Sequence, residues 1–488
     1  MVFSSITFVL VFLPLTICIY FLTANIISKR IKFKCLNIIL LLSSMIFYAW
    51  GEPTYVFLLL GSMYANYFIA LAIEVNKGRT NGKVWLYAGV LVNLLYLIYF
   101  KYFNFLLSTK LLGFAVSELP ADLRPAPNFH ISLPLGISFY TFQAISYLID
   151  VHRGNAKVAK SLIDFGCYLT MFPQLVAGPI VRYENIAREL VSRDLTFENF
   201  AEGVKRFTFG LAKKLLIADP LGRIADAAFS IPDGEVTALA AWSGMICYSF
   251  QIYFDFSGYS DMAIGLGKIF GFTFPENFNY PYTSKSLSEF WRRWHMTLGG
   301  WFKDYLYIPL GGNRHGLLRN CLNLFIVFSL CGFWHGADWM FLIWGAYYGV
   351  ILVIERLGNH FPERVMPSYL AHLYTIILFS IGWLIFRSEN WHQFLHFFSG
   401  LFKFEEMTPQ SFKVCIPLFT YSTYITLSLA FLLSMPFYPW IKSILTKKLE
   451  SRTNLCSCLA YSWVFLLLIF CYLPLFGATY NAFIYFRF

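Results

Sequence analysis

Long apolar runs recur along almost the whole chain of 488 residues. A run near twenty residues is long enough to cross the ~30 Å hydrocarbon core of a bilayer as a helix. Charged residues make up only 13% of the chain, about half the share of roughly 25% found in soluble domains. So little charge cannot coat a soluble globule of this size, which excludes a cytosolic enzyme, a disordered chain and a secreted module. The sequence predicts an all-α, polytopic membrane protein.

The apolar runs predict roughly 11–12 membrane-embedded helices. Some runs are shorter than a full crossing, and we expect these to be re-entrant or broken helices inside the bundle. No repeat or low-complexity linker separates them, so residues 1–488 are predicted to form a single membrane domain. The runs lie at 6–24, 36–50, 54–73, 84–107, 131–149, 161–180, 238–256, 320–334, 337–354, 373–387, 416–436 and 459–476.

The formal net charge of +11 fits either a nucleic-acid partner or a membrane protein with basic cytoplasmic loops. The basic residues gather in short loops between apolar runs, at 29–34, 77–83 and 153–160, whereas the alternate loops, including 116–130, carry little positive charge. This pattern favours contact with membrane lipid and no nucleic-acid partner. It also predicts that the N-terminus and the C-terminus both lie outside the cytoplasm.

Two segments are too charged to cross the membrane. Residues 198–219 place Phe200 and Phe207 on one helical stripe with lysines and arginines off it, which is typical of a basic amphipathic helix at the membrane interface. Residues 271–319 combine basic residues with many aromatics and glycines, and we interpret them as a cytoplasmic or interfacial segment. The aromatic end of the chain, 477–488, is predicted to form an extracytoplasmic tail.

His335 and Asp338 interrupt the apolar region 320–354. An ionisable side chain at membrane depth is costly and marks a functional site by default. The alternative is a packing histidine that hydrogen-bonds a neighbouring helix, and for a lone histidine the two interpretations carry equal weight. A second histidine, His295, lies in the aromatic and basic segment 291–305 and favours function. If that segment folds back into the bundle, both imidazoles share one cavity.

Two further clusters carry polar groups beside apolar runs. Asp255 and Asp261 lie at the end of one run, and one interpretation is that Asp261 or its neighbour Ser260 caps a helix that follows. Gln174 lies among two prolines and a glycine in 172–179. That pattern predicts a broken helix, which is tolerated only where it is buried in protein or lines a cavity.

Motifs exclude several classes of enzyme. The chain has no GxxxxGK[ST] phosphate loop, no GxSxG nucleophile motif and no HExxH zinc motif. His335 and Asp338 could join His295 as metal ligands, but this spacing is common and we expect no metal. Intramembrane histidine and aspartate also suit a proton-coupled transporter, and inert buried histidines suit a structural scaffold. These two alternatives stay open at this point.

The chain resembles the membrane-bound O-acyltransferase (MBOAT) superfamily. The resemblance is to the bacterial branch whose members O-acetylate alginate or peptidoglycan, or transfer D-alanine to teichoic acid. Each motif alone is weak, and their combination is specific. The motifs are FYAWGEP at 47–53, FPQ at 172–174, and the segments 253–261, 291–305 and 332–338. The resemblance implies an all-helical bundle around a central tunnel and an acyltransferase activity.

The same resemblance implies a substrate pair. An acetyl group would move from a cytoplasmic donor, acetyl-CoA or another acyl thioester, to an extracellular or cell-wall polysaccharide, with no cofactor staying bound. It implies a bacterial cytoplasmic (inner) membrane and an extracytoplasmic acetyltransferase partner of the SGNH type. The acceptor polysaccharide cannot be read from the sequence, and D-alanyl transfer to teichoic acid by the same mechanism is the alternative.

Two histidines match the positions that the family uses for catalysis, His335 and His295. A neutral imidazole, with an ordinary pKa of about 6.5, can take a hydroxyl proton at neutral pH, and we assign this role to His335. His295 is expected to orient it, to bind the donor carbonyl or to pass the proton on. A low-dielectric tunnel strengthens such contacts and excludes water that would hydrolyse the thioester.

Other residues are expected to support this chemistry. Tyr485, near the end of the chain, resembles a tyrosine proposed to carry the acyl group onward in this branch, with an aromatic interfacial anchor as the alternative. The donor phosphates are expected to bind basic residues that could equally be interfacial anchors, namely Arg292, Arg293 and Lys303. The residues expected to line or support the tunnel are Gln174, Asp255, Asp261, Trp291, Trp334 and Asp338.

Overall fold

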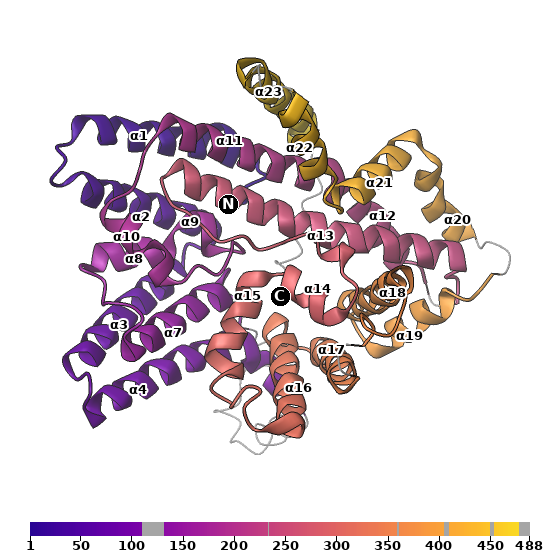
Figure 1. Ribbon diagram of the computed structural model, residues 1–488, viewed down its shortest axis with the longest axis horizontal. Coiled ribbons are helices and arrows are strands. Elements are labelled where there is room, and N and C mark those ends of the chain that lie inside the picture. The colour runs from indigo at the N-terminus through magenta and orange to yellow at the C-terminus, as the bar shows by residue number, and fades with distance from the viewer. Residues whose placement is uncertain (110–130, 233, 359–360, 405–408, 449–452, 478–488) are drawn as a thin grey trace, which may run out of the picture. The chain divides into compact units, whose positions relative to one another are not determined.

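The computed structural model describes residues 1–109, 131–232, 234–358, 361–404, 409–448 and 453–477 (Figure 1). All regular structure in these ranges is helical, and they contain no strand. Contacts divide the chain into two compact units. The first unit comprises Met1–Asn199, Phe270–Phe274 and Gly336–Asp338, and the second comprises Phe200–Ile269, Pro275–His335 and Trp339–Phe488.

Seven helices in the described part of the chain are long and apolar enough to cross a membrane, and a bent pair could add an eighth. The all-α, multi-pass prediction is confirmed. Several of the roughly 11–12 embedded helices expected from apolar runs do not qualify as full spans, because burial inside the protein also favours apolar residues. The seven are Thr7–Ile26, α2 (Lys32–Gly51), α3 (Val56–Val75), Thr80–Ser108, α16 (Gly316–His335), α17 (Trp339–Leu357) and α18 (Ser368–Arg387).

In the first unit, spanning helices pack around shorter buried ones. The last part of the first span is α1 (Leu13–Ile26), and α4 (Thr80–Leu97) opens the fourth. α3 and α4 are joined by reciprocal amide hydrogen bonds between Asn66 and Asn93, with N···O distances of 2.6 and 3.2 Å. Such pairs satisfy polar groups that would otherwise be unbonded in an apolar interior. The shorter helices are α7 (Ile137–Arg153), α8 (Leu162–Thr170), α9 (Phe172–Leu175) and α10 (Tyr183–Val191).

A buried arginine ties this unit together. Arg193, just after α10, donates from Nε to the Tyr20 hydroxyl of α1 at 2.8 Å and from Nη1 to Asn37 Oδ1 of α2, also at 2.8 Å. Its guanidinium carbon lies 4.5 Å from the ring centroid of Phe272, so the segment 270–274 belongs to this unit through a cation–π contact.

The second unit is organised around one long helix, α13 (Ala238–Ile269). α11 (Phe197–Ala212) approaches α13 closely: a Cβ on Gly203 would lie 2.7 Å from the Gly265 carbonyl oxygen, and one on Gly210 would lie 2.5 Å from that of Gly258. Only glycine permits this separation of the two backbones. The other helices of the unit are α12 (Asp219–Phe229), α14 (Leu287–Arg293), α15 (Met296–Phe302), α19 (Trp391–Gly400), α20 (Pro409–Cys415), α21 (Tyr421–Leu433), α22 (Phe437–Lys448) and α23 (Thr453–Gly477), with α16, α17 and α18 (Figure 1).

The structure corrects one expectation about α13. The helix continues without a break through Ser260 and Asp261 to Ile269, so neither residue is an N-cap of a separate helix. The predicted helix 198–219 is resolved into α11 and a π-helical turn at Lys213–Ala218. Its location at a membrane interface stays a prediction, as does that of 271–319.

α16 and α17 form a tight antiparallel hairpin. A Cβ on Gly332 would lie 2.8 Å from the Gly345 Cα and would also meet the Phe341 carbonyl oxygen. The two helices can approach this closely only because small residues face each other. This packing fixes the end of α16, where His335 is the last helical residue.

We predict that Gly332→Val lowers the free energy of unfolding by about 1–3 kcal/mol or more, because the added methyl groups must push α16 and α17 apart. The matched control is Gly61→Val in α3, where an added Cβ meets nothing within 4 Å. Thermal unfolding in detergent, followed by size exclusion, should show a lower melting temperature for the first variant only. Equal melting temperatures for both variants would contradict the packing described for the hairpin.

Candidate functional site

His335 lies in a wall of aromatic side chains in the second unit. Its side chain is buried, and its ring makes edge-to-face contacts with three aromatic rings: Trp334, Trp344 and Phe386, at centroid distances of 5.0, 5.2 and 5.6 Å. Apolar walls of this kind keep water away from an imidazole and strengthen polar contacts to it. The hairpin of α16 and α17 holds both His335 and Trp344 in this arrangement.

His295 lies in the short connection between α14 and α15 and is only 2% exposed. Its backbone has a φ of 45°, in the left-handed region that few residues other than glycine adopt. Nδ1 lies 3.0 Å from Asn277 Oδ1, and the ring contacts Phe256 edge-on at 4.7 Å. Nε2 is buried and has no hydrogen-bond partner among the described residues. A strained backbone and an unsatisfied buried nitrogen together are typical of a functional position.

The structure places the two imidazoles in the same unit and close enough to interact electrostatically. Burial, with a smaller contribution from His335, holds the pKa of His295 well below its usual value. His295 is therefore neutral at physiological pH, with one ring nitrogen carrying a lone pair. A neutral imidazole can accept a proton from a hydroxyl group.

Asp255 is held by a buried ion cluster. The Lys214 ammonium lies 2.7 Å from an oxygen of Asp255 and 2.7 Å from one of Asp219. The Lys214 and Asp255 side chains are only 3% and 1% exposed. Charges buried this deeply are tolerated only when they are paired. The cluster therefore fastens the π-helical turn of Lys213–Ala218 and the start of α12 to the middle of α13.

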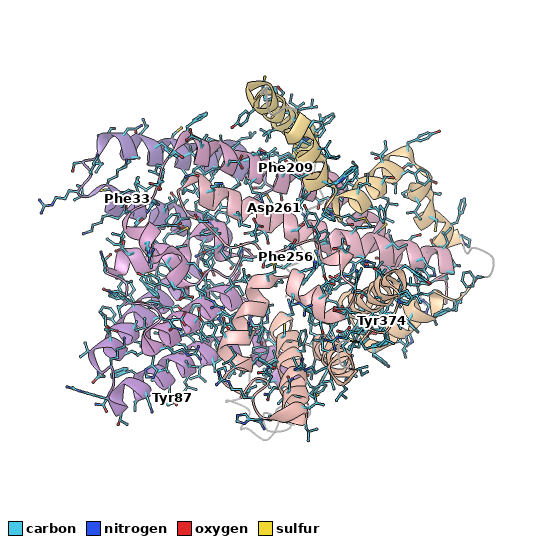
Figure 2. The ribbon with its side chains drawn as sticks, viewed as in Figure 1. Phe33, Tyr87, Phe209, Phe256, Asp261 and Tyr374 are labelled. Carbon is cyan, nitrogen blue, oxygen red and sulfur yellow. The ribbon has the colours of Figure 1, made fainter. Side chains whose placement is uncertain are left out.

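Asp261, six residues further along α13, is paired in the same way. It binds Lys213 at 2.6 Å and Arg206 at 2.7 Å, and Arg206 also reaches Glu276. Although burial opposes it, the charges of Lys213 and Arg206 hold the pKa of Asp261 below its usual value. Figure 2 shows Asp261 and Phe256 on the same helix. Both predicted aspartates thus anchor the helix that carries Phe256 to His295.

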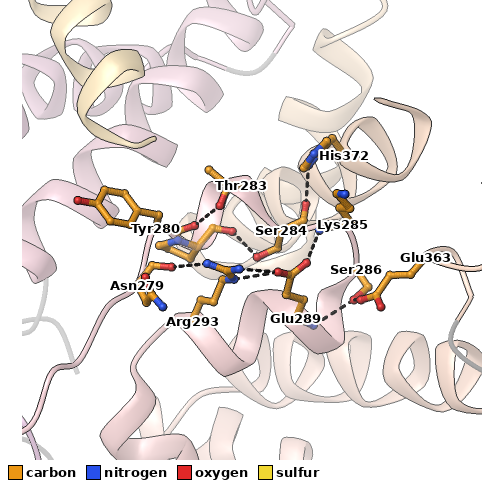
Figure 3. Close-up of polar contacts among 11 residues, drawn as sticks. Asn279, Tyr280, Thr283, Ser284, Lys285, Ser286, Glu289, Arg293, Glu363 and His372 are labelled. Atoms are coloured by element: carbon orange, nitrogen blue, oxygen red, sulfur yellow. Dashed lines mark hydrogen bonds and ion pairs between the residues drawn. The ribbon is translucent and has the colours of Figure 1, made fainter. Parts of the chain in front are cut away.

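A polar network fixes the segment that leads to His295 (Figure 3). Arg293 donates to Glu289 from Nε at 2.9 Å and to the Asn279 carbonyl from Nη1 at 3.2 Å. Ser286, the N-cap of α14, binds Glu363. These bonds fold the segment back on itself and so orient α14.

The start of α14 is held by a carboxylate from α17. Glu355 accepts the backbone N–H groups of Leu287 at 2.7 Å and Ser288 at 2.8 Å. These N–H groups have no partner within the helix, and a negative charge favours their end of the helix dipole. Glu355 thus ties α14, which carries Trp291, to the hairpin that carries His335.

Two indole N–H groups lie in this aromatic wall without a partner. Trp291 and Trp344 are T-shaped neighbours with ring centroids 5.6 Å apart, and neither Nε1 has a hydrogen-bond partner among the described residues. Trp344 was missed by sequence reasoning, because an indole in an apolar run looks like an ordinary core residue. Trp344 lies nine positions after His335, beyond the turn that joins α16 to α17, and helical periodicity does not relate residues across such a turn.

The remaining predicted residues belong to both units. Gln174 lies buried in α9 of the first unit and donates to the Tyr168 carbonyl, and Asp338 is an exposed residue of that unit. Trp334 contacts His335 directly. Tyr485 lies outside the described residues.

The three basic residues expected at the donor site differ in their surroundings. Arg292 and Lys303 are exposed, whereas Arg293 is engaged by Glu289. Among the residues that the structure describes, no group of three or more His, Cys, Asp or Glu side chains is arranged to hold a metal ion.

Residues 42–386 match the MBOAT, membrane-bound O-acyltransferase family. The chain belongs to this family and is a multi-pass membrane acyltransferase. The resemblance inferred from the five motifs is confirmed, and the transporter and scaffold alternatives are set aside.

Three relatives illustrate the range of the family around this chain. A probable alginate O-acetylase AlgI of Pseudomonas aeruginosa is 44% identical over 406 residues, which cover 83% of this chain and 75% of that protein. A peptidoglycan O-acetyltransferase of Helicobacter pylori is 36% identical over 432 residues, covering 82% and 80%. A teichoic acid D-alanyltransferase of Bacillus subtilis is 28% identical over 279 residues, covering 53% and 69%.

We predict that Lys214→Met lowers the free energy of unfolding by about 3–5 kcal/mol, because it removes the cation that lies 2.7 Å from each of two buried carboxylates. Lys205→Met is the matched control, since the Lys205–Glu202 pair is partly exposed and should contribute less than about 1 kcal/mol. Melting temperatures of the two purified variants provide the measurement. A Lys214→Met protein as stable as the wild type would show that the ion cluster does not hold α13.

Proposed function

We propose that this protein transfers acetyl groups to hydroxyls of a polysaccharide outside the membrane. The observation that carries the proposal is the buried pair of imidazoles in an aromatic wall, one of which has an unsatisfied Nε2. The names of two relatives that match more than four-fifths of this chain support acetyl as the group and a polysaccharide as the acceptor.

The proposed donor is acetyl-CoA, or another acyl thioester, presented from the cytoplasm. The exposed cations Arg292 and Lys303 suit the phosphates of such a donor. Arg293 already neutralises Glu289, so we assign it to positioning α14. No resident cofactor is needed, because a thioester carries its own activated acyl group.

The proposed chemistry uses the imidazole pair and the indoles together. An imidazole takes the proton of the attacking hydroxyl while its oxygen bonds to the acyl carbon, and the carbon–sulfur bond then breaks. We assign the first contact with the hydroxyl to His335. The N–H groups of Trp344 and Trp291, which have no hydrogen-bond partner among the described residues, are suited to stabilise the oxyanion that develops on the carbonyl oxygen.

We further propose that the protein works in a bacterial cytoplasmic membrane with both termini outside, alongside an extracytoplasmic partner of the SGNH type. In this arrangement Tyr485 would carry the acyl group towards the partner. An acyl adduct on the C-terminal peptide during turnover distinguishes such a carrier from an aromatic membrane anchor.

D-alanyl transfer remains the second candidate, supported by a relative that matches 53% of this chain. The shared chemistry means that the two candidates differ in the donor and not in the imidazole pair. Analysis of the ester-linked group on isolated polysaccharide and wall fractions separates them, since acetate and D-alanine are released by mild base and identified directly.

We predict that His335→Ala lowers the amount of ester-linked acetate by about 10²-fold or more, the usual contribution of a general base. Acetate would be measured on exopolysaccharide and wall fractions from cells with and without the protein. His315→Ala, which changes an exposed histidine of the same unit, is the control and should keep full activity. Normal acetylation by a well-expressed His335→Ala protein would refute the assignment.

A further inference from the structure

Asn277 connects three elements beside His295. Its side chain is 1% exposed. Its Nδ2 donates to Ser260 Oγ on α13 at 3.1 Å. Its Oδ1 accepts the backbone N–H of Thr297 at 3.3 Å and the Thr297 hydroxyl at 2.9 Å, and it lies 3.0 Å from His295 Nδ1. Its backbone carbonyl accepts the N–H of Met296 at 2.9 Å.

The orientation of this amide follows from the chemistry of its neighbours. A backbone N–H can only donate, so the atom that faces the Thr297 N–H must be the oxygen of Asn277. The same oxygen faces His295 Nδ1. Because an amide oxygen can only accept, Nδ1 must carry the hydrogen in this contact.

This bond determines which tautomer of His295 exists. A neutral imidazole has one N–H, and here it is on Nδ1, so Nε2 carries only a lone pair. Of the three roles expected for His295, donation of a hydrogen bond to the donor carbonyl by the neutral ring is therefore excluded. Accepting a proton is the role that this tautomer permits.

We propose that Asn277 is a positioning residue that fixes the Nδ1–H tautomer of His295, so that Nε2 is the proton acceptor of the imidazole pair. This inference rests on the proposed acyl-transfer function. In the reaction, the hydroxyl proton reaches His295 Nε2, directly or through His335, as the hydroxyl oxygen forms the ester bond. When the carbon–sulfur bond breaks, the thiolate takes this proton from the imidazolium and leaves as a thiol, and the imidazole returns to its neutral form, so protons and charges balance.

The contacts around His295 hold its ring in one orientation before a substrate binds. The left-handed backbone of His295 turns the chain so that Met296 and Thr297 both bond to Asn277 at the start of α15. Ser260 anchors Asn277 to α13, the helix that also supplies Phe256 to the imidazole ring. A hydrogen bond from Nδ1 and the contact with Phe256 therefore hold the ring, and Nε2 is the ring nitrogen left to accept a proton.

Asn277 also has a purely structural role, since it satisfies the first N–H groups of α15. Two substitutions separate this role from the proposed one. Asn277→Asp keeps an oxygen that caps the helix but places a carboxylate against Nδ1. Asn277→Leu has a similar size and removes both functions. Among the described residues, His335 is the titratable group whose charge acts on His295, and it stays unchanged in both variants.

For the test, we would measure initial rates with labelled acetyl-CoA in membrane vesicles that hold the full chain, across a range of pH. We expect Asn277→Leu to lower kcat by about 10²-fold with little change in KM, as loss of a tautomer-fixing partner does elsewhere. We expect Asn277→Asp to stay active while its acid limb moves to higher pH by about one unit or more, because the carboxylate stabilises the imidazolium.

A second readout does not depend on activity. Exchange of the His295 ring C2 hydrogen with deuterium, measured by mass spectrometry against pH, reports the titration midpoint of this imidazole. The midpoint should rise in Asn277→Asp and stay in place in Asn323→Leu, a control that removes a different buried amide bonded to the Gly312 carbonyl.

The outcomes distinguish the role of Asn277 from the proposed acetyl-transfer function. A wild-type midpoint in Asn277→Asp, or a wild-type kcat in Asn277→Leu, would overturn the role of Asn277 while leaving the proposed function intact. A wild-type protein that transfers no acetyl group would overturn the proposed function, and the exchange midpoints would still decide whether Asn277 controls His295. If Asn277→Leu does not reach the membrane, Asn277→Asp alone decides.

Discussion

The structure depends on the cost of burying charge in apolar surroundings. An unpaired buried ion costs several kcal/mol, so each carboxylate of α13 must be met by a cation from another element. Lys214 meets Asp255, and Lys213 with Arg206 meets Asp261. These pairs specify one register between α13 and the segment beside it. The same helix then presents Phe256 and Ser260 to the segment around His295.

The membrane helices could be predicted from the sequence because long apolar runs are a local signal, whereas the catalytic roles of the two histidines stay predictions. Long runs with few charges predict membrane helices, and His335 is conspicuous in such a run, whereas His295 lies in the aromatic and basic segment 291–305. The role of Asp261 could not be predicted, since an aspartate after an apolar run looks like a helix cap. Its actual partners lie on another helix and are specified only by tertiary packing.

Asn277 was overlooked for a related reason. It lies 18 residues before His295 in an irregular segment, where no periodicity relates one side chain to another. Arg293 shows the converse: its charge suggested a donor phosphate, but Glu289 one helical turn earlier binds it. Partners of polar groups are decided by the fold, whereas the presence of polar groups is visible in the sequence. Polar residues were therefore easier to single out from the sequence than their partners.

The candidate site consists of two buried imidazoles beside aromatic rings, and burial keeps His295 neutral. Residues outside the site position the helices that carry it. Glu355 holds the start of α14, and the glycines of the α16–α17 hairpin hold the end of α16. A site built on helices in this way keeps its geometry better than one built on free loops.

The central claim is that His295 and His335 act as one catalytic unit. A double-variant cycle tests it most directly, with acetyl-transfer rates measured for His295→Gln, His335→Gln and the double variant at equal protein levels. Residues that act together are strongly non-additive, so the double variant should be no more than about threefold slower than the slower single variant. If the rate of the double variant instead falls by the product of the two single-variant losses, the two imidazoles act independently, which would contradict this claim.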